Sequence, residues 1–227
     1  DVPDFALPAN GLQTVGNLAD AVVPTPPNVT DACGNAIVPA APTKTAAPNC
    51  QGTVVYTFNY TDCEGNTHDW TYTYTIELDP FAVPANGSAT VNCIADTTTP
   101  TPPTVSDANG NPITPTMAQS ADPTCSGSKV FTFTYTDCAG NTKDWTYTYT
   151  IDVPDFTAPA NGGSTVDCLA DAKVAPATPT VIDACGNALI PVLKTTPADI
   201  ACSGAMVWVY TYTDCEGNAH DWSYTYT

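Results

Sequence analysis

A short segment with reactive side chains occurs three times, as TDCEGNTHDWTYTYT from residue 61, TDCAGNTKDWTYTYT from residue 136 and TDCEGNAHDWSYTYT from residue 213. Its Asp, Cys, Glu and His could act as general acid and base or as metal ligands. The middle copy has Lys143 where the others have His68 and His220, and its Glu position holds Ala139. A base or a metal ligand does not survive such a replacement. The sequence therefore predicts no catalytic residue here and no enzyme.

The residues that all three copies keep are those that build a β-hairpin. In residues 54–60 and 70–76 every second side chain is aromatic or aliphatic, and those between are Thr, Asn and Val55, which is the period of a half-buried strand. The connection DCEGN holds an Asp that caps a turn and a Gly-Asn pair that accepts positive φ. The segment therefore predicts two antiparallel strands joined by a short turn with Gly in the left-handed conformation.

This hairpin closes a module that fills the whole chain three times over. Phe81 follows Phe5 by 76 residues, and Phe156 follows Phe81 by 75. We place the modules at residues 1–77, 78–151 and 152–227. Shorter strands are expected near residues 90–93, 103–106 and 113–117 of the second copy, separated by Pro-rich turns. This pattern predicts an all-β fold of three tandem immunoglobulin-like β-sandwich modules, arranged as an elongated rod.

The charge and hydropathy of the chain exclude several classes of partner. The formal net charge is −18, with five basic residues and no Arg, so no nucleic acid and no anionic membrane surface is expected to bind. No apolar run approaches the roughly 20 residues of a membrane span, so no membrane insertion is expected. No basic and apolar leader opens the sequence. Because the last copy stops where the first two continue into Ile, the chain is expected to be part of a longer polypeptide.

The ten cysteines occupy four recurring positions, which we number slots 1 to 4. Slot 1 holds Asn17, Cys93 and Cys168; slot 2 holds Cys33, Asn109 and Cys185; slot 3 holds Cys50, Cys125 and Cys202; slot 4 holds Cys63, Cys138 and Cys215. Disulfides are favoured over a metal centre, because no C-x-x-C pair occurs and His recurs at one position alone. Disulfides place the chain outside the cytosol.

Strand length limits which slots can pair within one module. The strand between Cys50 and Cys63 spans about 26 Å, whereas a disulfide needs Cα atoms within about 7 Å. Slots 3 and 4 of one module are therefore not expected to pair. Slots 2 and 4 lie in similar turns that contain Asp, Gly and Asn, which favours slot 2 with slot 4 and slot 1 with slot 3. The alternative is slot 1 with slot 4 and slot 2 with slot 3.

In the third module the favoured pairing gives Cys185–Cys215 and Cys168–Cys202. The other disulfide candidates are Cys33, Cys63, Cys93 and Cys125, and the cysteines left without partners are Cys50 and Cys138.

Two further kinds of site are indicated by short sequence features. Acidic residues gather at the module junctions, and Asp79, Asp152 and Asp155 could hold Ca²⁺ between extracellular β-modules. Solvated acidic linkers and caps are the favoured interpretation of the same residues, so no cofactor is required. The DTT triplet at residues 96–98 resembles a short acidic motif of bacterial surface O-glycosylation, with Thr97 as the candidate acceptor.

The motifs VYTFNYTDCEGNTHDWTYTYTI, TVNCIAD and TVIDACGN resemble the hyalin repeat (HYR) family over all three copies. The resemblance implies immunoglobulin-like, extracellular modules associated with adhesion. That family has a Cys in its last strand where this chain has HDW or KDW, so its disulfide pattern does not transfer. The near-identical acidic copies, rich in Thr and Pro, are similar to the giant surface adhesins of gliding bacteria of the SprB type, which the type IX system exports. The likeness implies a location at the bacterial cell surface.

These features predict a non-catalytic repeat segment of a secreted adhesin or filament, with disulfide-stapled modules that act as a spacer or stalk in adhesion or gliding. The expected partners are neighbouring modules of the same chain, surface glycans, or other copies of the filament. Two alternatives stay open. One is a carbohydrate-binding array, and the other is a self-assembling extracellular fibre.

Overall fold

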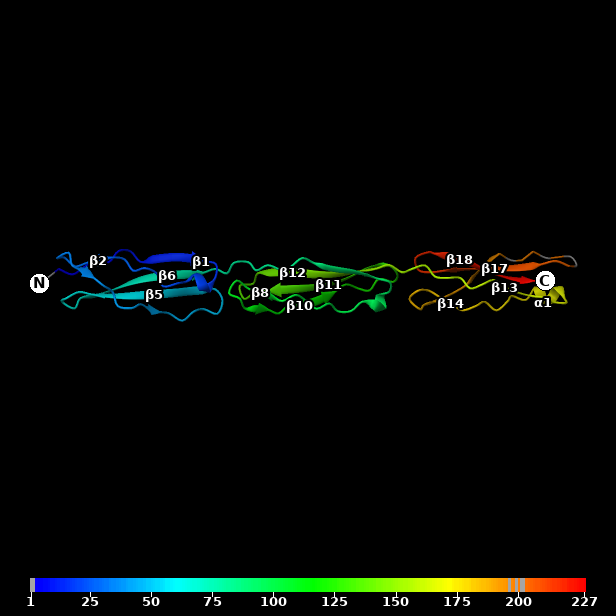
Figure 1. Ribbon diagram of the computed structural model, residues 1–227, viewed down its shortest axis with the longest axis horizontal. Coiled ribbons are helices and arrows are strands. Elements are labelled where there is room, and N and C mark those ends of the chain that lie inside the picture. Colours follow the sequence, from blue (N-terminus) through cyan, green and yellow to red (C-terminus); the bar gives the residue numbers. More distant parts are fainter. Residues whose placement is uncertain (1–2, 196, 199, 201–202) are drawn as a thin grey trace. The chain divides into compact units, whose positions relative to one another are not determined.

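The computed structural model describes residues 3–195, 197–198, 200 and 203–227, so Cys202 lies outside the described residues. The chain divides into two compact units. The first contains Asp1–Ala85, Pro102–Met117 and Phe133–Trp145, and the second contains Asn86–Thr101, Ala118–Thr132 and Thr146–Thr227. Strands build both units (Figure 1). The helical pieces of the described chain are the 3-10 turns η1 (Leu18–Asp20) and η2 (Ile94–Asp96) and the single turn α1 (Leu169–Ala172).

The first module is a sandwich of a four-stranded and a two-stranded sheet. The larger sheet has the order β1-β6-β5-β4. Its strands are β1 (Gly11–Val15), β4 (Thr43–Lys44), β5 (Gly52–Thr61) and β6 (Thr67–Ile76), and the smaller sheet pairs β2 (Val29–Thr30) with β3 (Ala36–Ile37). Val29 and Ile37 of the small sheet share one hydrophobic cluster with Phe58, Tyr60 and Trp70 of the large sheet. The core therefore lies between the two sheets.

The second and third modules repeat this plan. Their larger sheets have the orders β10-β11-β12-β7 and β13-β18-β17-β16, and their smaller sheets pair β8 with β9 and β14 with β15. The strands are β7 (Gly87–Val91), β8 (Val105–Ser106), β9 (Pro112–Ile113), β10 (Thr116–Gln119), β11 (Gly127–Thr136), β12 (Thr142–Ile151), β13 (Gly162–Ser164), β14 (Val181–Ile182), β15 (Ala188–Leu189), β16 (Val192–Thr195), β17 (Met206–Thr213) and β18 (Ala219–Tyr226). The predicted fold of three tandem all-β sandwich modules is confirmed.

The short strands of the second module differ in detail from the prediction. The strand expected over residues 90–93 is β7, which begins at Gly87 and ends at Val91. Cys93 instead caps the start of η2, where Asp96 accepts a hydrogen bond from its backbone N–H. The strand expected over 113–117 is divided between β9 and β10. The alternation that predicts strands does not report where a local cap ends them.

The predicted hairpin is confirmed in the first module. Phe58 pairs with Trp70 across β5 and β6, and the alternate residues Val54, Tyr56 and Tyr60 are at most 3% exposed. The intervening residues Val55, Thr57 and Asn59 lie on the other face, partly or fully exposed. Gly65 in the connecting turn has φ of +89°, the left-handed conformation that the sequence requires there.

The motif PANG at the start of the module fastens β1 to β6. The indole Nε1 of Trp70 donates to Ala9 O at 2.9 Å, and Asn10 Oδ1 accepts from the backbone N–H of Thr71 at 3.0 Å. A Cβ at Gly11 would lie 2.1 Å from a ring carbon of Tyr72, so only Gly fits this close approach. The motif thus sets the register of the parallel β1–β6 pair.

One turn, Asp-x-x-Gly-Asn, occurs twice in every module. In the first module Asp62 Oδ1 accepts from the backbone N–H groups of Glu64 and Asn66, and Asp62 Oδ2 accepts from Asn66 Nδ2. The other turns begin at Asp31, Asp107, Asp137, Asp183 and Asp214. Hydrogen bonds from the Asn66 side chain above all hold the pKa of Asp62 below its ordinary value of 3.8. Asn35 does the same for the pKa of Asp31.

These turns predict loss of stability in acid. A carboxylate whose folded pKa is depressed stabilises the fold above its unfolded pKa, and this contribution is lost as pH falls through the folded pKa. For Asp31 and Asp62 that window lies below 3.8. We expect the unfolding midpoint in denaturant to change little from these groups between about pH 7 and 5, and to fall below about pH 4. Denaturant titrations at stepped pH measure this. An Asp62→Asn variant should lose less stability in the first module than the parent when the pH is lowered. A loss as large as that of the parent would contradict the assignment of the acid sensitivity to this turn.

Candidate functional site

The three disulfides of the described chain each join one module to the next. Their Cα–Cα distances are 5.9, 5.6 and 5.7 Å. The pairs are Cys50–Cys138, Cys93–Cys185 and Cys125–Cys215. The first lies within the first compact unit, and the other two lie within the second.

The pairing follows one rule. Slot 3 of a module bonds slot 4 of the next module, and slot 1 bonds slot 2 of the next module. Strand register explains why. Val15 and Gly52 both pair with Ile76, so the chain leaves the sheet for slots 1 and 3 at the same end. Slots 2 and 4 lie in the two Asp turns at the other end of β5. The carboxylates that begin these turns, Asp31 and Asp62, are near enough to each other to interact electrostatically. Each module therefore has two cysteine-bearing poles.

The predicted pairing within a module is wrong. Cys185 bonds Cys93 instead of Cys215, and Cys215 bonds Cys125. The expected grouping of slots 2 and 4 at one pole holds in the first module, but their partners come from the preceding module. Cys50 and Cys138, which the prediction left alone, bond each other.

Among the described residues, three disulfide candidates are free, exposed thiols: Cys33, Cys63 and Cys168. The predicted Cys168–Cys202 pair involves Cys202, which lies outside the described residues. Cys33 and Cys63 occupy slots 2 and 4 of the first module, and Cys168 occupies slot 1 of the last. In the three bonds of the described chain, slots 2 and 4 of a module are joined to the module before it, and slots 1 and 3 to the module after it.

The sequence carries a signal for this pairing that within-module reasoning missed. Slot 1 of the first module is Asn17, and slot 2 of the second is Asn109. The rule pairs these two positions with each other, and both of them lack Cys. Asn109 Oδ1 accepts from the backbone N–H of Leu18 at 2.8 Å, so a hydrogen bond takes the place of the disulfide.

Restoring the two cysteines should create a fourth disulfide. We expect Asn17→Cys combined with Asn109→Cys to form it spontaneously in an oxidising buffer and to stabilise the first junction by about 2–4 kcal/mol. Peptide mapping by mass spectrometry and denaturant unfolding measure the bond and its effect. Each single variant is the control and should form no new bond within the chain. Pairing of a new thiol with Cys33 or Cys168 in the double variant would contradict the rule.

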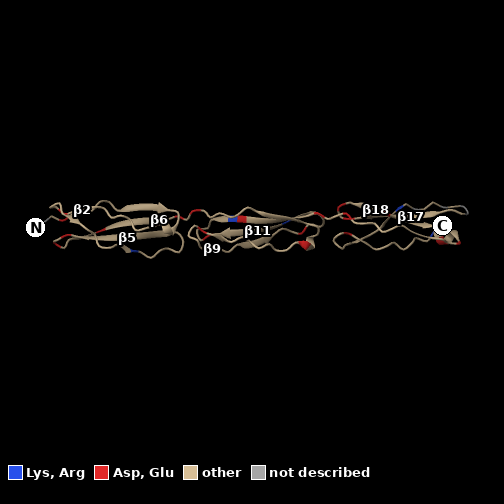
Figure 2. Ribbon diagram, viewed as in Figure 1, with Lys and Arg blue, Asp and Glu red and all other residues tan. Residues whose placement is uncertain are grey.

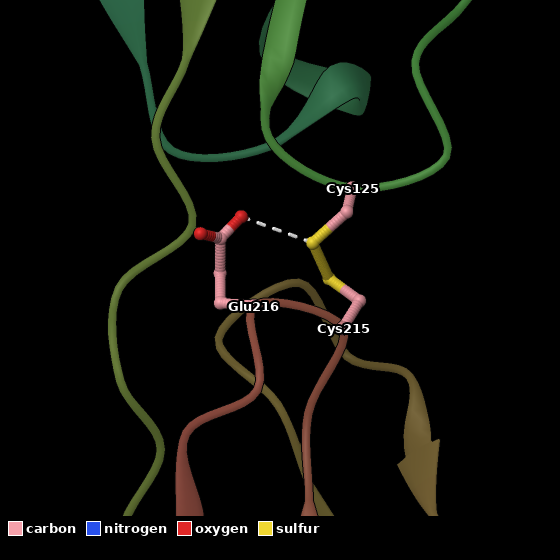
Figure 3. A group of neighbouring side chains, drawn as sticks. All are labelled: Cys125, Cys215 and Glu216. Atoms are coloured by element: carbon pink, nitrogen blue, oxygen red, sulfur yellow. Dashed lines mark hydrogen bonds between the residues drawn. A yellow bond between two sulfur atoms is a disulfide. The ribbon is translucent and has the colours of Figure 1, made fainter.

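Glu216 adds a polar contact to the disulfide next to it (Figure 3). Its Oε1 lies 3.0 Å from Cys125 Sγ and accepts from the backbone N–H of Ser126 at 3.1 Å. Cys125, Cys215 and Glu216 are the one group of three metal-ligand side chains within the described part of the chain. Both sulfurs are committed to a disulfide, and a metal needs thiolates. Glu216 of the third module therefore contacts the disulfide and the backbone of the second module, which makes this group a structural contact between modules.

The residues predicted to bind Ca²⁺ make other contacts. Both carboxylate oxygens of Asp155 lie 2.9 Å from His220 Nε2, and Asp4 makes the same contact with His68. The backbone N–H of Asp152 donates to Val91 O. Asp79 donates its backbone N–H to Gly16 O, and its carboxylate fills the space beside Gly16. Binding of Ca²⁺ at these positions stays a prediction.

The His–Asp contacts explain why the middle copy differs from the others. Lys143 stands in the His position, and Pro80 stands where the other modules have Asp. Because both members of the contact are replaced in the same copy, the His and the Asp are structural partners of each other.

The predicted glycosylation site is partly covered. The Thr97 hydroxyl donates to Ile94 O at 2.8 Å, and the side chain is half-buried at the end of η2. Its modification stays a prediction.

Acidic residues lie mainly in turns and connecting segments of the ribbon, and the basic residues are few and separate (Figure 2). Lys194 Nζ lies 2.5 Å from Asp221 Oδ2, and this contact above all lowers the pKa of Asp221. No helix in the described part of the chain is long and apolar enough to cross a membrane.

The fold and the junctions define a class of protein: tandem β-sandwich modules joined by disulfides from each module to the next. Disulfides of this kind belong to oxidising, extracellular compartments. The profile of the HYR-like domain with four cysteines matches residues 5–76, 81–151 and 156–227. The chain belongs to this family. Each matched range contains four cysteine slots, and only the third module has Cys at all four of them.

Solved structures give weak likenesses. The structure of mouse clustered PcdhgC3 EC1-3 is 8% identical, with a TM-score of 0.26, over 78% of this chain and 76% of that one. Human CDH23 EC21-23 is 11% identical with a TM-score of 0.26, over 100% of both chains. The Ca²⁺-stabilized adhesin with which an Antarctic bacterium binds ice is 16% identical with a TM-score of 0.25, over 76% of this chain and 55% of that one. Likenesses this weak carry no functional information. No protein of curated function matches the sequence.

Proposed function

We propose that this chain is a non-catalytic spacer segment of a bacterial cell-surface adhesin or filament, and that its disulfides carry tension from module to module. The observation that supports the proposal is the overlap of the three disulfide loops. The first loop ends at Cys138, after the other two loops have begun at Cys93 and Cys125. The three loops therefore overlap along the sequence.

The overlap shortens the covalent path between the two termini. We count one link for each step between consecutive residues. The path runs over 49 links from residue 1 to Cys50 and crosses the disulfide to Cys138. It then returns over 13 links to Cys125, crosses to Cys215 and continues over 12 links to residue 227, which makes 74 links in place of 226. Under load the tension therefore enters each inner module at slot 4 and leaves it at slot 3. The segment between these slots in the second module is β11, one strand of the large sheet.

The chemistry of the three copies supports a mechanical role over a catalytic one. The copies share the Asp turns, the PANG motif and the buried Trp, all of which have structural contacts, and they share no reactive His or Glu. The carbohydrate-binding alternative receives less support, because the large hydrophobic residues that are exposed in the described chain are aliphatic or Met and include no aromatic. Aromatic side chains on an open surface are what a sugar-binding face would need.

Single-molecule stretching between the termini tests the proposal. At about 3.3–3.6 Å per link, the oxidised chain should extend to about 250 Å and the reduced chain to about 780 Å. An oxidised chain that extends as far as the reduced one would show that tension does not pass through the disulfides. A glycan array with the same oxidised chain tests the alternative, and specific binding would favour it.

A further inference from the structure

The two junctions of the chain differ in how their disulfides are protected. In the described chain one disulfide joins the first module to the second, and two join the second to the third. In the same order they are Cys50–Cys138, Cys93–Cys185 and Cys125–Cys215. The first and the last of these bonds both connect slot 3 to slot 4. They differ in the space around the sulfur atoms and in the charge beside them.

A hollow of about 310 Å³ lies beside the bond of the first junction. Its lining includes Cys138, Asn49 and Thr114, and Cys138 is exposed. Pockets that admit small organic molecules begin at about 300 Å³. The Cys50–Cys138 bond is therefore open to attack by a small thiol from solvent.

The disulfides of the second junction surround a much smaller space. A hollow of about 50 Å³ is lined by Cys125, Cys185, Cys215 and Ile94, among others. This is far below the size at which pockets admit small organic molecules, about 300 Å³. Cys93, the partner of Cys185, is 8% exposed. Because Cys215 is exposed, however, space alone does not protect its bond.

A carboxylate lies next to the Cys125–Cys215 bond and has no counterpart at the same position of the first junction. Glu216 Oε1 lies 3.0 Å from Cys125 Sγ, and the backbone N–H of Ser126 donates to it at 3.1 Å. The residue that follows the slot 4 cysteine at the first junction is Ala139. The two homologous bonds therefore differ by one negative charge at this position.

The Asp turns place matching carboxylates at both junctions. Asp107 and Asp137 begin the turns that line the hollow of the first junction, and Asp183 and Asp214 begin the same turns at the second. The carboxylate of Glu216 is added to this common set. A disulfide is attacked by a thiolate, which is negatively charged. A like charge about 4 Å away should lower the rate of that attack about fivefold in water.

We propose that the first junction is redox-sensitive: a small thiol reduces Cys50–Cys138 before the other two disulfides, while Glu216 protects Cys125–Cys215 by repelling the attacking thiolate. The reductant is a low-molecular-weight thiol such as glutathione. Its thiolate attacks Cys138 Sγ, the S–S bond breaks, and the Cys50 thiolate leaves and takes up a proton. A second glutathione thiolate attacks the glutathione sulfur of the mixed disulfide and releases the Cys138 thiolate. One protein disulfide is thereby reduced, and two glutathione molecules are oxidised to one glutathione disulfide.

Reduction of this one bond releases the first junction alone. Asn17 and Asn109 stand at its other pair of slots, so the described chain has no second disulfide between the first two modules. A contact that remains there is the hydrogen bond from the Leu18 N–H to Asn109 Oδ1. The second junction keeps both of its bonds. The proposal goes beyond the spacer role, since it concerns how one junction is released without the other.

The first experiment measures the order in which the three bonds open in the folded, oxidised chain. Free thiols are blocked with iodoacetamide, and the chain is then treated with 2-mercaptoethanol at low salt. New thiols are trapped at intervals with N-ethylmaleimide and located by peptide mapping. We expect Cys50–Cys138 to open at least about fivefold faster than either bond of the second junction. Equal rates for the three bonds, or earlier opening at the second junction, would overturn the proposal.

A reciprocal pair of variants isolates the charge. Glu216→Gln keeps a side-chain oxygen for the Ser126 N–H and should speed the opening of the adjacent disulfide about fivefold. Ala139→Glu places a carboxylate at the same position of the first junction and should slow the opening of its bond by a similar factor. Both effects should shrink in about 1 M salt, and with cysteamine, whose ammonium group offsets the charge of its thiolate. An unchanged rate in Glu216→Gln would refute the protection by Glu216 and so overturn the proposal.

Hydrogen exchange reports the release of each junction. After selective reduction the Leu18 amide, which donates to Asn109, should exchange about tenfold faster than in the oxidised chain. The Val153 amide donates to Ser126 Oγ at 3.2 Å at the second junction, and it should be unchanged. Unchanged exchange at Leu18, or equally faster exchange at Val153, would show that the first junction is not released on its own. These measurements are made without load, so their failure would leave the path of tension through the disulfides, and with it the spacer role, to its separate test.

Discussion

Replacing Trp70 with Ala should destabilise the first module by about 3–5 kcal/mol, because a Trp-to-Ala change in a packed core removes buried contacts and leaves a cavity. Trp70 is 5% exposed, packs against Phe58 with ring centroids 5.7 Å apart, and donates its indole N–H to Ala9 O. The change would therefore also release the PANG segment from β6.

Hydrogen exchange followed by mass spectrometry is the suitable measurement, since a chain of several modules does not unfold in one two-state step. Peptides from β5 and β6 should exchange about 100-fold to 4,000-fold faster, at about 1.4 kcal/mol for each factor of ten. Peptides from β17 and β18 of the third module serve as the internal reference and should be unchanged.

The Trp70→Phe variant separates the two roles of the side chain. It keeps most of the ring in the core but leaves Ala9 O without its donor, which should cost about 1–3 kcal/mol. A Phe variant as unstable as the Ala variant would show that the hydrogen bond to the PANG segment, and not the packing, dominates.

The hairpin and the modules could be predicted because their signals are local. Alternation in 54–60 and 70–76 fixes which face of each strand is buried, and Gly65 with Asn66 fixes the turn between them. These features depend on neighbours in the sequence, so repeated motifs are sufficient evidence. Partners across the sheet, such as Ala9 for Trp70, are 61 residues away and have no local signature.

The cysteine pairing could not be derived in the same way. Strand length excludes a disulfide between slots 3 and 4 of one module, and the structure has none there, but strand length does not indicate whether a bond closes within a module or between two modules. The bonded residues are 88 to 92 positions apart, longer than one repeat, so each partner lies in the next copy. The joint loss of Cys at Asn17 and Asn109 was the available evidence, because independent changes would not fall on two halves of one bond.

Removal of a single disulfide should lengthen the stretched chain by an amount that depends on which bond is lost. With Cys50→Ser and Cys138→Ser, the shortest covalent path runs over 92 links to Cys93 and 42 links from Cys185 to the end, 134 in place of 74. We expect the maximal extension of the oxidised chain to rise from about 250 Å to about 460 Å at about 3.3–3.6 Å per link. Single-molecule stretching between the termini measures it directly.

The matched control removes a different bond of the same kind. The path of 74 links uses Cys50–Cys138 and Cys125–Cys215 but not Cys93–Cys185. Cys93→Ser with Cys185→Ser should therefore leave the maximal extension at about 250 Å, even though it deletes a disulfide from the junction of the second and third modules. If both double variants lengthened the chain equally, tension would not follow the slot 3 to slot 4 bonds. If only the first did, the two slot 3 to slot 4 bonds would carry the load, and the slot 1 to slot 2 bond would lie off the path of tension.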